Sequence, residues 1–320
     1  MSGATVVISV EIELEWGFHD IIQPSNVSEG AVAERETLRS LLNLCDEVDI
    51  PITFNVVGHL LHASCNGEHD SPHEDGWFLA DPGTNVDTHP GYYAPDMIHT
   101  IIDAETSHEI CTHTYSHALF DESDRQTANW ELQRTRELFS LFEIPPSRSI
   151  VPPRHRTPPK DVLRDLGIDI VRLPMPGFER QSQGRVRKFL STLSDQIPRS
   201  TPRVVDGVVE TYCTPHPSLS ALYLPNGRNQ AHPAFRAIPM WLRRRLHSRQ
   251  LRRSLDRTIE EQSTLHVWTH LQNISNDAQW PQVASFIRKL GSERKKGNVS
   301  VLTMEELSQR VLSDASNLTE

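Results

Sequence analysis

Two histidines four residues apart are the first residues in the sequence whose spacing could support metal chemistry. They are His113 and His117, in the segment HEICTHTYSH. On one helical turn, side chains at this spacing lie one above the other, and two imidazoles can bind one metal ion at about 2 Å each. Residues 109–111 are a candidate strand, so we expect the pair where a strand ends and a helix begins. The alternative is a polar turn with two unrelated histidines, since the chain contains 16 histidines.

Carboxylates alternate with apolar residues at the end of the first predicted strand, residues 5–14. Glu11, Glu13 and Glu15 fall on one face of that strand. Three carboxylates on a buried face need a cation or hydrogen bonds. A central first strand therefore favours a bound cation, whereas an exposed edge strand would leave a solvated acidic row.

Two further candidates follow predicted strands. Arg154 lies in VPPRHR, directly after residues 149–151, where a guanidinium can orient a carboxylate or an oxyanion. An ordinary loop arginine is the alternative. His270 ends the predicted strand 265–270 and is followed by LQN.

The segment 62–76 is polar and contains three histidines. These could bind a metal, but the acidic composition favours a surface loop. The next residues include Trp77, Tyr92 and Tyr93, whose rings suit stacking on a sugar or could cover the mouth of a barrel.

Strands and helices alternate along the chain, which predicts a parallel sheet. About seven or eight strands with intervening helices, without a linker or an internal repeat, predict one α/β barrel domain over residues 1–320. Residues 174–203 are irregular and basic. The predicted strands are 5–14, 51–58, 109–111, 149–151, 168–171, 204–212 (with a turn at Asp206), 265–270 and 299–302, and the predicted helices are 30–48, 95–102, 124–142, 159–166, 239–262, 278–290 and 304–312.

Composition excludes several classes of protein. A hydrophobic content of 37% with 23% charged residues is typical of a globular domain, and a net charge of −10 argues against a general nucleic-acid binder. Four widely spaced cysteines without a C-x-x-C pair are typical of reduced thiols. With no signal-peptide pattern and no long apolar run, the sequence predicts a cytoplasmic protein.

One helix, around residues 241–253 (WLRRRLHSRQLRR), is strongly basic in this acidic chain. Such a helix can lie on an anionic membrane surface. It could equally bind the diphosphate of a lipid- or nucleotide-linked sugar, or simply be a solvated helix paired with the acids that follow it.

Five segments resemble the polysaccharide deacetylase family of metal-dependent carbohydrate amidases and esterases. In chain order they are ISVEIELEWG, TFNVVGHLL, HEICTHTYSH, VPPRHR and LHVWTHLQN. They span about residues 5–275, and a C-terminal strand and helix follow in residues 276–313. The resemblance implies a single distorted (β/α)7-type barrel that resembles a TIM barrel. Two features depart from the family: its first motif normally carries aspartates, and its arginine motif has an aromatic residue after the proline.

The resemblance also implies a metal site. Glu13, His113 and His117 would bind Zn²⁺ or another divalent metal, and three protein ligands leave open positions for water and substrate.

The implied catalytic groups are Glu11 as general base, Arg154 to hold Glu11 in place, and His270 to protonate the leaving amine. Glu15 could replace either acid. The implied activity is hydrolysis of a non-peptide carbon–nitrogen bond that removes an acetyl or formyl group from a sugar or glycan intermediate. Two alternatives are a catalytically impaired carbohydrate-binding or regulatory protein and an amidase for a small non-sugar amide.

Overall fold

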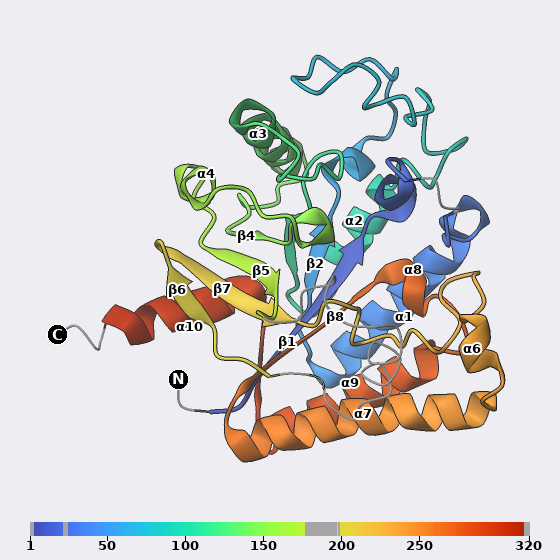
Figure 1. Cartoon of the computed structure of the whole chain (residues 1–320), viewed down its shortest axis with the longest axis vertical. Coiled ribbons are helices and arrows are strands. Elements are labelled where there is room, and N and C mark those ends of the chain that lie inside the picture. Colours follow the sequence, from blue (N-terminus) through green and yellow to red (C-terminus); the bar gives the residue numbers. More distant parts are fainter. Residues whose placement is uncertain (1–2, 22–24, 177–196, 198, 317–320) are drawn as a thin grey trace.

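A curled, mostly parallel sheet organises the protein (Figure 1). The computed structural model describes residues 3–21, 25–176, 197 and 199–316. The strand order is β6-β7-β5-β4-β3-β2-β1-β8, with β9 also paired to β1. Every pair is parallel except β6–β7. The strands are β1 (Thr5–Ile12), β2 (Thr53–Val56), β3 (Glu109–Thr112), β4 (Ser149–Ile150), β5 (Ile170–Pro174), β6 (Arg203–Val205), β7 (Val208–Cys213), β8 (Thr264–His270) and β9 (Ser300–Leu302).

The curl of the sheet brings its two ends together. Thr211 Oγ1 on β7 lies 3.1 Å from His266 Nδ1 on β8, although these strands are far apart in the sheet order. The predicted barrel class is therefore confirmed as a distorted, half-open barrel.

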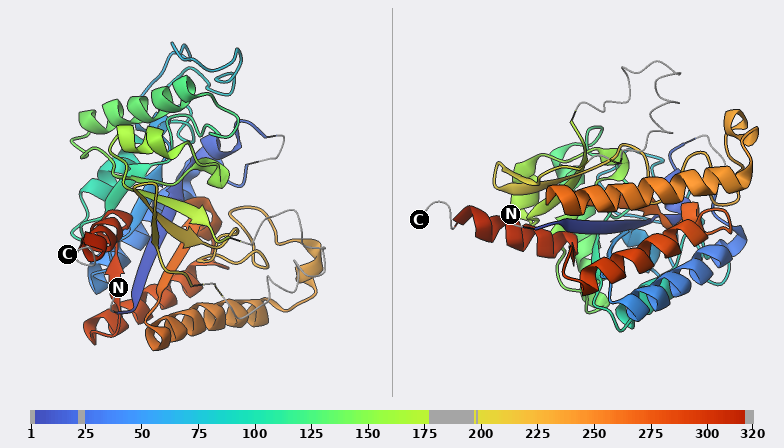
Figure 2. Two further views of the ribbon diagram at one scale, coloured as in Figure 1. Left: turned by 60° about the vertical axis from the view of Figure 1, so that its left-hand side comes forward. Right: turned by 90° about the horizontal axis from the view of Figure 1, so that it is seen from below.

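Helices cover the outside of this sheet (Figure 2), and α9 packs against both α1 and α7. The helices are α1 (Val32–Val48), α2 (Pro95–Ile102), α3 (Arg125–Leu141), α4 (Lys160–Asp165), α6 (Pro233–Arg236), α7 (Met240–Glu261), α8 (Leu271–Ile274), α9 (Trp280–Lys295) and α10 (Met304–Ser316), and the 3-10 turns are η1 (Leu14–Phe18), η2 (Glu29–Ala31), η3 (Gly58–Leu61) and η4 (Pro153–His155).

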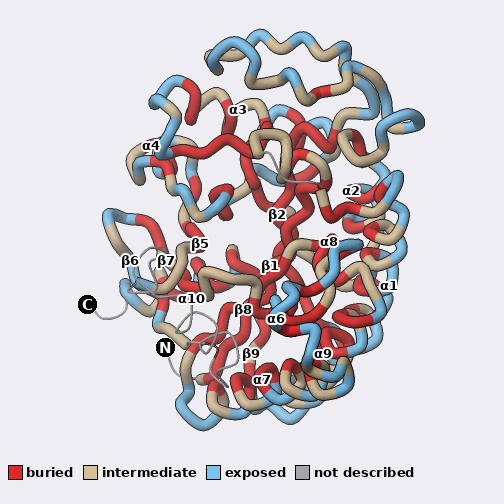
Figure 3. Tube along the Cα trace, turned by 45° about the vertical axis from the view of Figure 1, so that its right-hand side comes forward, coloured by how far each residue is buried: buried red, intermediate tan, exposed pale blue. Residues whose placement is uncertain are grey.

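Strand β1 is buried along its whole length, as the burial colouring shows (Figure 3). Alternate side chains of a strand point to opposite faces. Val6, Ile8 and Val10 join the main hydrophobic cluster, which contains residues of α1 and α9. Ser9 and Glu11 therefore face the inside of the barrel, where they contact side chains of other strands.

The prediction of a helical turn at the two histidines is wrong. Residues 113–117 form a loop instead of a helical turn, because Thr114 and His117 have φ angles of 65° and 63°. The strand-like residues 204–212 form the β6–β7 hairpin, and the chain reverses at the expected turn at Asp206 and at Gly207, both with positive φ. Most of the predicted irregular segment 174–203 lies outside the described residues.

The basic helix is α7, and its arginines divide into two groups. Arg243 is buried and donates hydrogen bonds to the carbonyls of Ile238 and Tyr223, while Arg244 donates to the carbonyl of Asp277. Other arginines of α7 are exposed, among them Arg245. In the described part of the chain, no helix combines the length and the apolar character that crossing a membrane requires.

Candidate active site

Glu13, His113 and His117 meet at one end of the barrel. Glu13 Oε1 lies 2.9 Å from His113 Nε2 and 3.3 Å from His117 Nε2. All three residues are buried, and one potential ligand atom from each lies within 4.8 Å of the others. The structure thus brings together the three residues that the sequence predicted as metal ligands.

The chemistry of this donor set fits a divalent metal. Two imidazoles and one carboxylate form a common ligand set of catalytic zinc sites. The Nδ1 atom of His113 lies 2.6 Å from the carbonyl oxygen of Val151. Donation from Nδ1 to that carbonyl directs Nε2 toward Glu13, an arrangement typical of metal-binding histidines.

A buried carboxylate on α3 shapes the loop that carries the two histidines. Glu131 Oε2 accepts hydrogen bonds from the backbone N–H groups of Tyr115 and Ser116, at 2.7 and 2.8 Å. Glu131 Oε1 accepts a further bond from the hydroxyl of Ser116. These bonds satisfy backbone donors that the positive φ angles of the loop leave without regular partners.

A second carboxylate, Glu11, lies beside the first group. His270 is aligned with Glu11 across the β1–β8 pair, and its Nε2 atom lies 2.9 Å from Glu11 Oε2. Arg172 on β5 forms an ion pair with Glu11 and donates to Ser9 Oγ at 2.8 Å. The guanidinium of Arg172 also lies over the ring of Trp268, 4.4 Å from its centroid. Glu11 is thus held between one cation and one imidazole.

The arginine that contacts Glu11 is Arg172, whereas the sequence predicted that Arg154 would hold it. Arg154 lies in η4 with a φ of 47° and pairs with Asp20. The physical reason is the length of β5. The sequence predicted that this strand ends at residue 171, but it continues to Pro174, and the buried Arg172 projects from it into the barrel.

Glu15 lies apart from both carboxylates. Leu14, with a φ of 48°, turns the chain out of the strand and into η1. The side chain of Glu15 packs against Gly91, which has no side chain. A Cβ at Gly91 would come within 2.7 Å of Glu15 Cγ. Among the described residues, the groups of potential metal ligands include Glu11 and Glu13 but not Glu15.

A cavity of about 380 Å³ opens over this cluster. Its lining includes Glu11, Glu13, His117, Arg154, Arg172 and His270, together with Phe18, Trp268, Asn226, Asn229 and Asn273.

The aromatic residues predicted to stack on a sugar have other contacts. Trp77 stacks on His73, Tyr93 is buried, and Tyr92 packs edge-on against Trp16. In the described part of the chain, the aromatic rings that line the cavity are instead those of Phe18 and Trp268.

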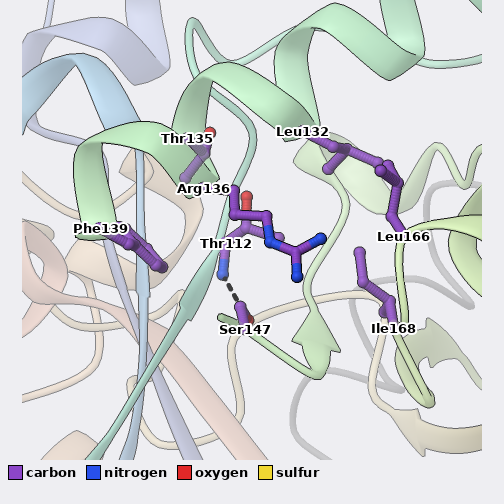
Figure 4. A pocket seen from close by; sticks show the side chains of 8 residues that line it. All are labelled: Thr112, Leu132, Thr135, Arg136, Phe139, Ser147, Leu166 and Ile168. Carbon is purple, nitrogen blue, oxygen red and sulfur yellow. Dashed lines mark hydrogen bonds between the residues drawn. The ribbon is translucent and has the colours of Figure 1, made fainter. Parts of the chain in front are cut away.

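A separate hollow between α3 and the strands is too small for a sugar (Figure 4). Its volume of about 20 Å³ is near the minimum for one water molecule. Thr112 N donates to Ser147 Oγ at its floor. The larger cavity is therefore the candidate active site.

The chain is similar to known proteins in part of its sequence and in its fold. Residues 29–171 match the family model described as polysaccharide deacetylase. This match covers 143 of the 320 residues. No protein among the curated sequences matches the chain.

Solved structures with the same fold cover nearly the whole of the chain. The "putative polysaccharide deacetylase" of Mycobacterium smegmatis has a TM-score of 0.62 at 16% identity, covering 98% of this chain and 92% of its own. The "probable polysaccharide deacetylase" of Pseudomonas aeruginosa PAO1 has a TM-score of 0.55 at 13% identity, covering 95% and 89%. Puue allantoinase has a TM-score of 0.53 at 14% identity, covering 95% and 89%. At these identities the likeness establishes the fold alone.

Charge pairing shifts the pKa values of Glu11 and His270 in opposite directions. Burial by itself would raise the pKa of Glu11, but Arg172 and then His270 lower that pKa to about 2. Burial would lower the pKa of His270, but Glu13 and Glu11 raise it to about 10. Without a bound metal, His270 is therefore an imidazolium and Glu11 a carboxylate at neutral pH.

This pairing predicts a pH-dependent contribution of His270 to the stability of the metal-free protein. The pKa of His270 is raised in the folded state above its ordinary value of 6.5. The stabilisation is therefore fully present below pH 6.5 and is lost as pH rises through about 10. We expect the free energy of unfolding lost in His270→Gln to be larger at pH 6.5 than at pH 10. Urea denaturation of both proteins with a chelator measures this difference. An equal loss at both pH values would contradict the ion pair.

Proposed function

We propose that the protein is a metal-dependent hydrolase that removes an N-acyl group, acetyl or formyl, from a sugar or glycan intermediate. One observation carries this proposal. A Glu-His-His donor set lies beside a second glutamate that is paired with both an arginine and a histidine, and Glu11, Glu13, His117, Arg172 and His270 of this cluster line one cavity. The match of residues 29–171 to the polysaccharide deacetylase family model supports the same chemistry.

The metal would be Zn²⁺ or another divalent ion held by Glu13, His113 and His117. When bound, such an ion polarises an acyl carbonyl and lowers the pKa of a water molecule.

The remaining steps belong to two side chains of the protein. Glu11 accepts a proton from the attacking water at a carboxylate oxygen, and Arg172 keeps that carboxylate ionised and oriented. Water oxygen bonds to the acyl carbon, and the carbon–nitrogen bond breaks. The nitrogen takes a proton from Nε2 of His270, so the products are a carboxylic acid and an amino sugar.

The cavity lining favours a sugar as the substrate. Its volume of about 380 Å³ lies within the range of about 300–1,000 Å³ that is usual for small-molecule sites. Asn226, Asn229 and Asn273 offer amide donors and acceptors for hydroxyl groups, while Phe18 and Trp268 offer apolar ring faces.

A test starts from metal-free protein. Addition of a divalent metal is expected to restore acetate or formate release from N-acetyl and N-formyl amino sugars. The variant His113→Ala is expected to lose one equivalent of bound metal relative to the parent, because it removes one of three ligands, and to lose this activity. His89→Ala, in an exposed loop position, is the matched control.

Two outcomes would overturn parts of the proposal. If His113→Ala keeps as much metal as the parent after dialysis against a chelator, the ligand assignment fails. If the metal-loaded parent binds N-acyl sugars without turnover, the protein is a carbohydrate-binding protein and not a hydrolase. If it hydrolyses only small non-sugar amides, the substrate is a small amide and not a sugar.

We propose further that α7 contacts an anionic membrane surface. Trp241 is 63% exposed, and Arg245, Arg249 and Arg252 follow it at spacings of four, four and three residues, which places them on one helix face. Each cation near such a surface contributes about 1 kcal/mol. Binding to liposomes should rise with anionic lipid content and fall with salt. No binding at low salt would leave α7 as a solvated helix.

A further inference from the structure

A second group of potential metal ligands lies outside the candidate active site. It consists of His59, Cys65, His69 and Asp81, whose ligand atoms all lie within 4.8 Å of one another. His69 Nε2 lies 2.8 Å from Asp81 Oδ2 and 3.6 Å from Cys65 Sγ. His59 Nε2 lies 3.1 Å from the same oxygen of Asp81. This group shares no residue with the Glu13, His113 and His117 set.

The hydrogen bonds around the group direct its ligand atoms inward. The second nitrogen of His69, Nδ1, lies 3.3 Å from the hydroxyl of Tyr115, which leaves Nε2 for the group. Asp81 Oδ1 accepts hydrogen bonds from the hydroxyl of Tyr93 and, at 3.1 Å, from the N–H of Gly83, which leaves Oδ2 for the group. Such outer hydrogen bonds are typical of metal ligands.

The separations fit a tetrahedral ion after small shifts. Ligand atoms about 2.0–2.3 Å from a zinc ion lie roughly 3.3–3.8 Å apart. The sulfur–nitrogen distance of 3.6 Å between Cys65 and His69 is already in that range. The distances from His59 Nε2 and His69 Nε2 to Asp81 Oδ2 are shorter, because they are those of hydrogen bonds. A metal ion would replace the protons of these hydrogen bonds.

The position of the group explains what an ion would do there. Cys65, His69 and Asp81 belong to the stretch between η3 and α2, where no helix or named strand occurs among residues 62–94. Long stretches of this kind inside a compact domain are uncommon unless they are functional. His59 lies in η3, which directly follows β2, and its side chain is fully buried. An ion bound to all four residues would tie this loop to the barrel.

We propose that His59, Cys65, His69 and Asp81 bind a structural Zn²⁺ ion. Four protein ligands that include a thiolate form a closed site, which differs from the three-ligand site with open positions in the cavity.

The proposed ion also supports the loop that carries His113 and His117. Trp77 donates from Nε1 to the hydroxyl of Ser116 at 2.8 Å, and His73 Nε2 lies 2.6 Å from Glu131 Oε1. Both Trp77 and His73 lie between His69 and Asp81 in the sequence. Loss of the structural ion is therefore expected to loosen the support of the loop 113–117, without removing any of its metal ligands.

Metal analysis of the full chain tests the proposal. The parent, purified with zinc and dialysed without a chelator, is expected to contain two zinc ions per chain. Cys65→Ser and His69→Gln are each expected to contain one zinc ion, the one in the cavity. His113→Ala is expected to contain only the zinc ion of the four-residue site. Cys45→Ser, which changes a buried thiol outside the group, should retain both ions.

Cobalt substitution gives a readout that needs no enzymatic activity. Cobalt bound at the four-residue site should show a thiolate-to-metal charge-transfer band in the near ultraviolet, because Cys65 is its sulfur ligand. This band should persist in His113→Ala and disappear in Cys65→Ser. The proposal is overturned if the cobalt-loaded parent lacks the band, or if Cys65→Ser keeps two zinc ions; either result leaves the proposed hydrolase activity untouched.

Discussion

Replacing Glu11 with glutamine is expected to lower kcat by about 10²–10⁴-fold while the metal stays bound. Glutamine keeps the shape of the side chain but cannot accept the proton from water. Glu11 is not one of the three proposed ligands, so the metal content should not change; a loss of metal would instead favour the group that Glu11 forms with Glu13 and His270. Steady-state kinetics on an N-acyl sugar, together with metal analysis of the same sample, measures both quantities.

Glu15→Gln provides the matched control for this experiment. Glu15 is another glutamate of the first motif, but it packs against Gly91. Its replacement should leave kcat within a few-fold of the parent value. Parental activity in Glu11→Gln, with a large loss in Glu15→Gln, would transfer the role of the base to Glu15.

The meeting of Glu13, His113 and His117 could be predicted because parallel strands end at one edge of a sheet. Each residue follows a strand that the sequence makes recognisable, β1 or β3. The local shape of the histidine loop could not be predicted. It depends on Glu131, a residue of α3 whose carboxylate reaches back to the loop only after the helix packs on the barrel.

Arg172 could not be selected from the sequence without the register of the strands. Its segment, IVRLP, contains one visible signal, a charged residue inside an apolar strand, which requires a buried partner. That partner, Glu11, lies on β1, and β2, β3 and β4 separate the two strands in the sheet. Only the curl of the sheet brings the two side chains together across the barrel.

The four-residue group in the loop between η3 and α2 shows a different limit. Sequence alone drew attention to His69 but favoured a surface loop, because the surrounding composition is acidic and polar. The partners are His59 in the preceding turn, Cys65 near the start of that loop and Asp81 in its interior. Such ligands have no fixed spacing, so tertiary structure is needed to recognise them.

Replacing Arg172 with methionine is expected to lower the free energy of unfolding by about 3–5 kcal/mol, the usual result of leaving a buried charge without its partner. Both Arg172 and Glu11 are almost fully buried, with exposures of 1% and 3%. The pKa of Glu11 should rise, because Arg172 is the main group that lowers it. The acidic limb of the pH–activity profile should therefore move to higher pH. Urea denaturation and pH-dependent kinetics measure the two effects.

Arg154→Met separates this role from that of the arginine in the sequence motif. Its pair with Asp20 is partly exposed, so its loss should cost only about 0–1 kcal/mol. A larger loss of stability in Arg154→Met than in Arg172→Met would restore Arg154 as the residue that holds Glu11. If Arg172 acts through Glu11, the double variant Glu11→Gln with Arg172→Met should be more stable than the sum of the two single losses predicts, because neither partner then remains as an unpaired buried charge.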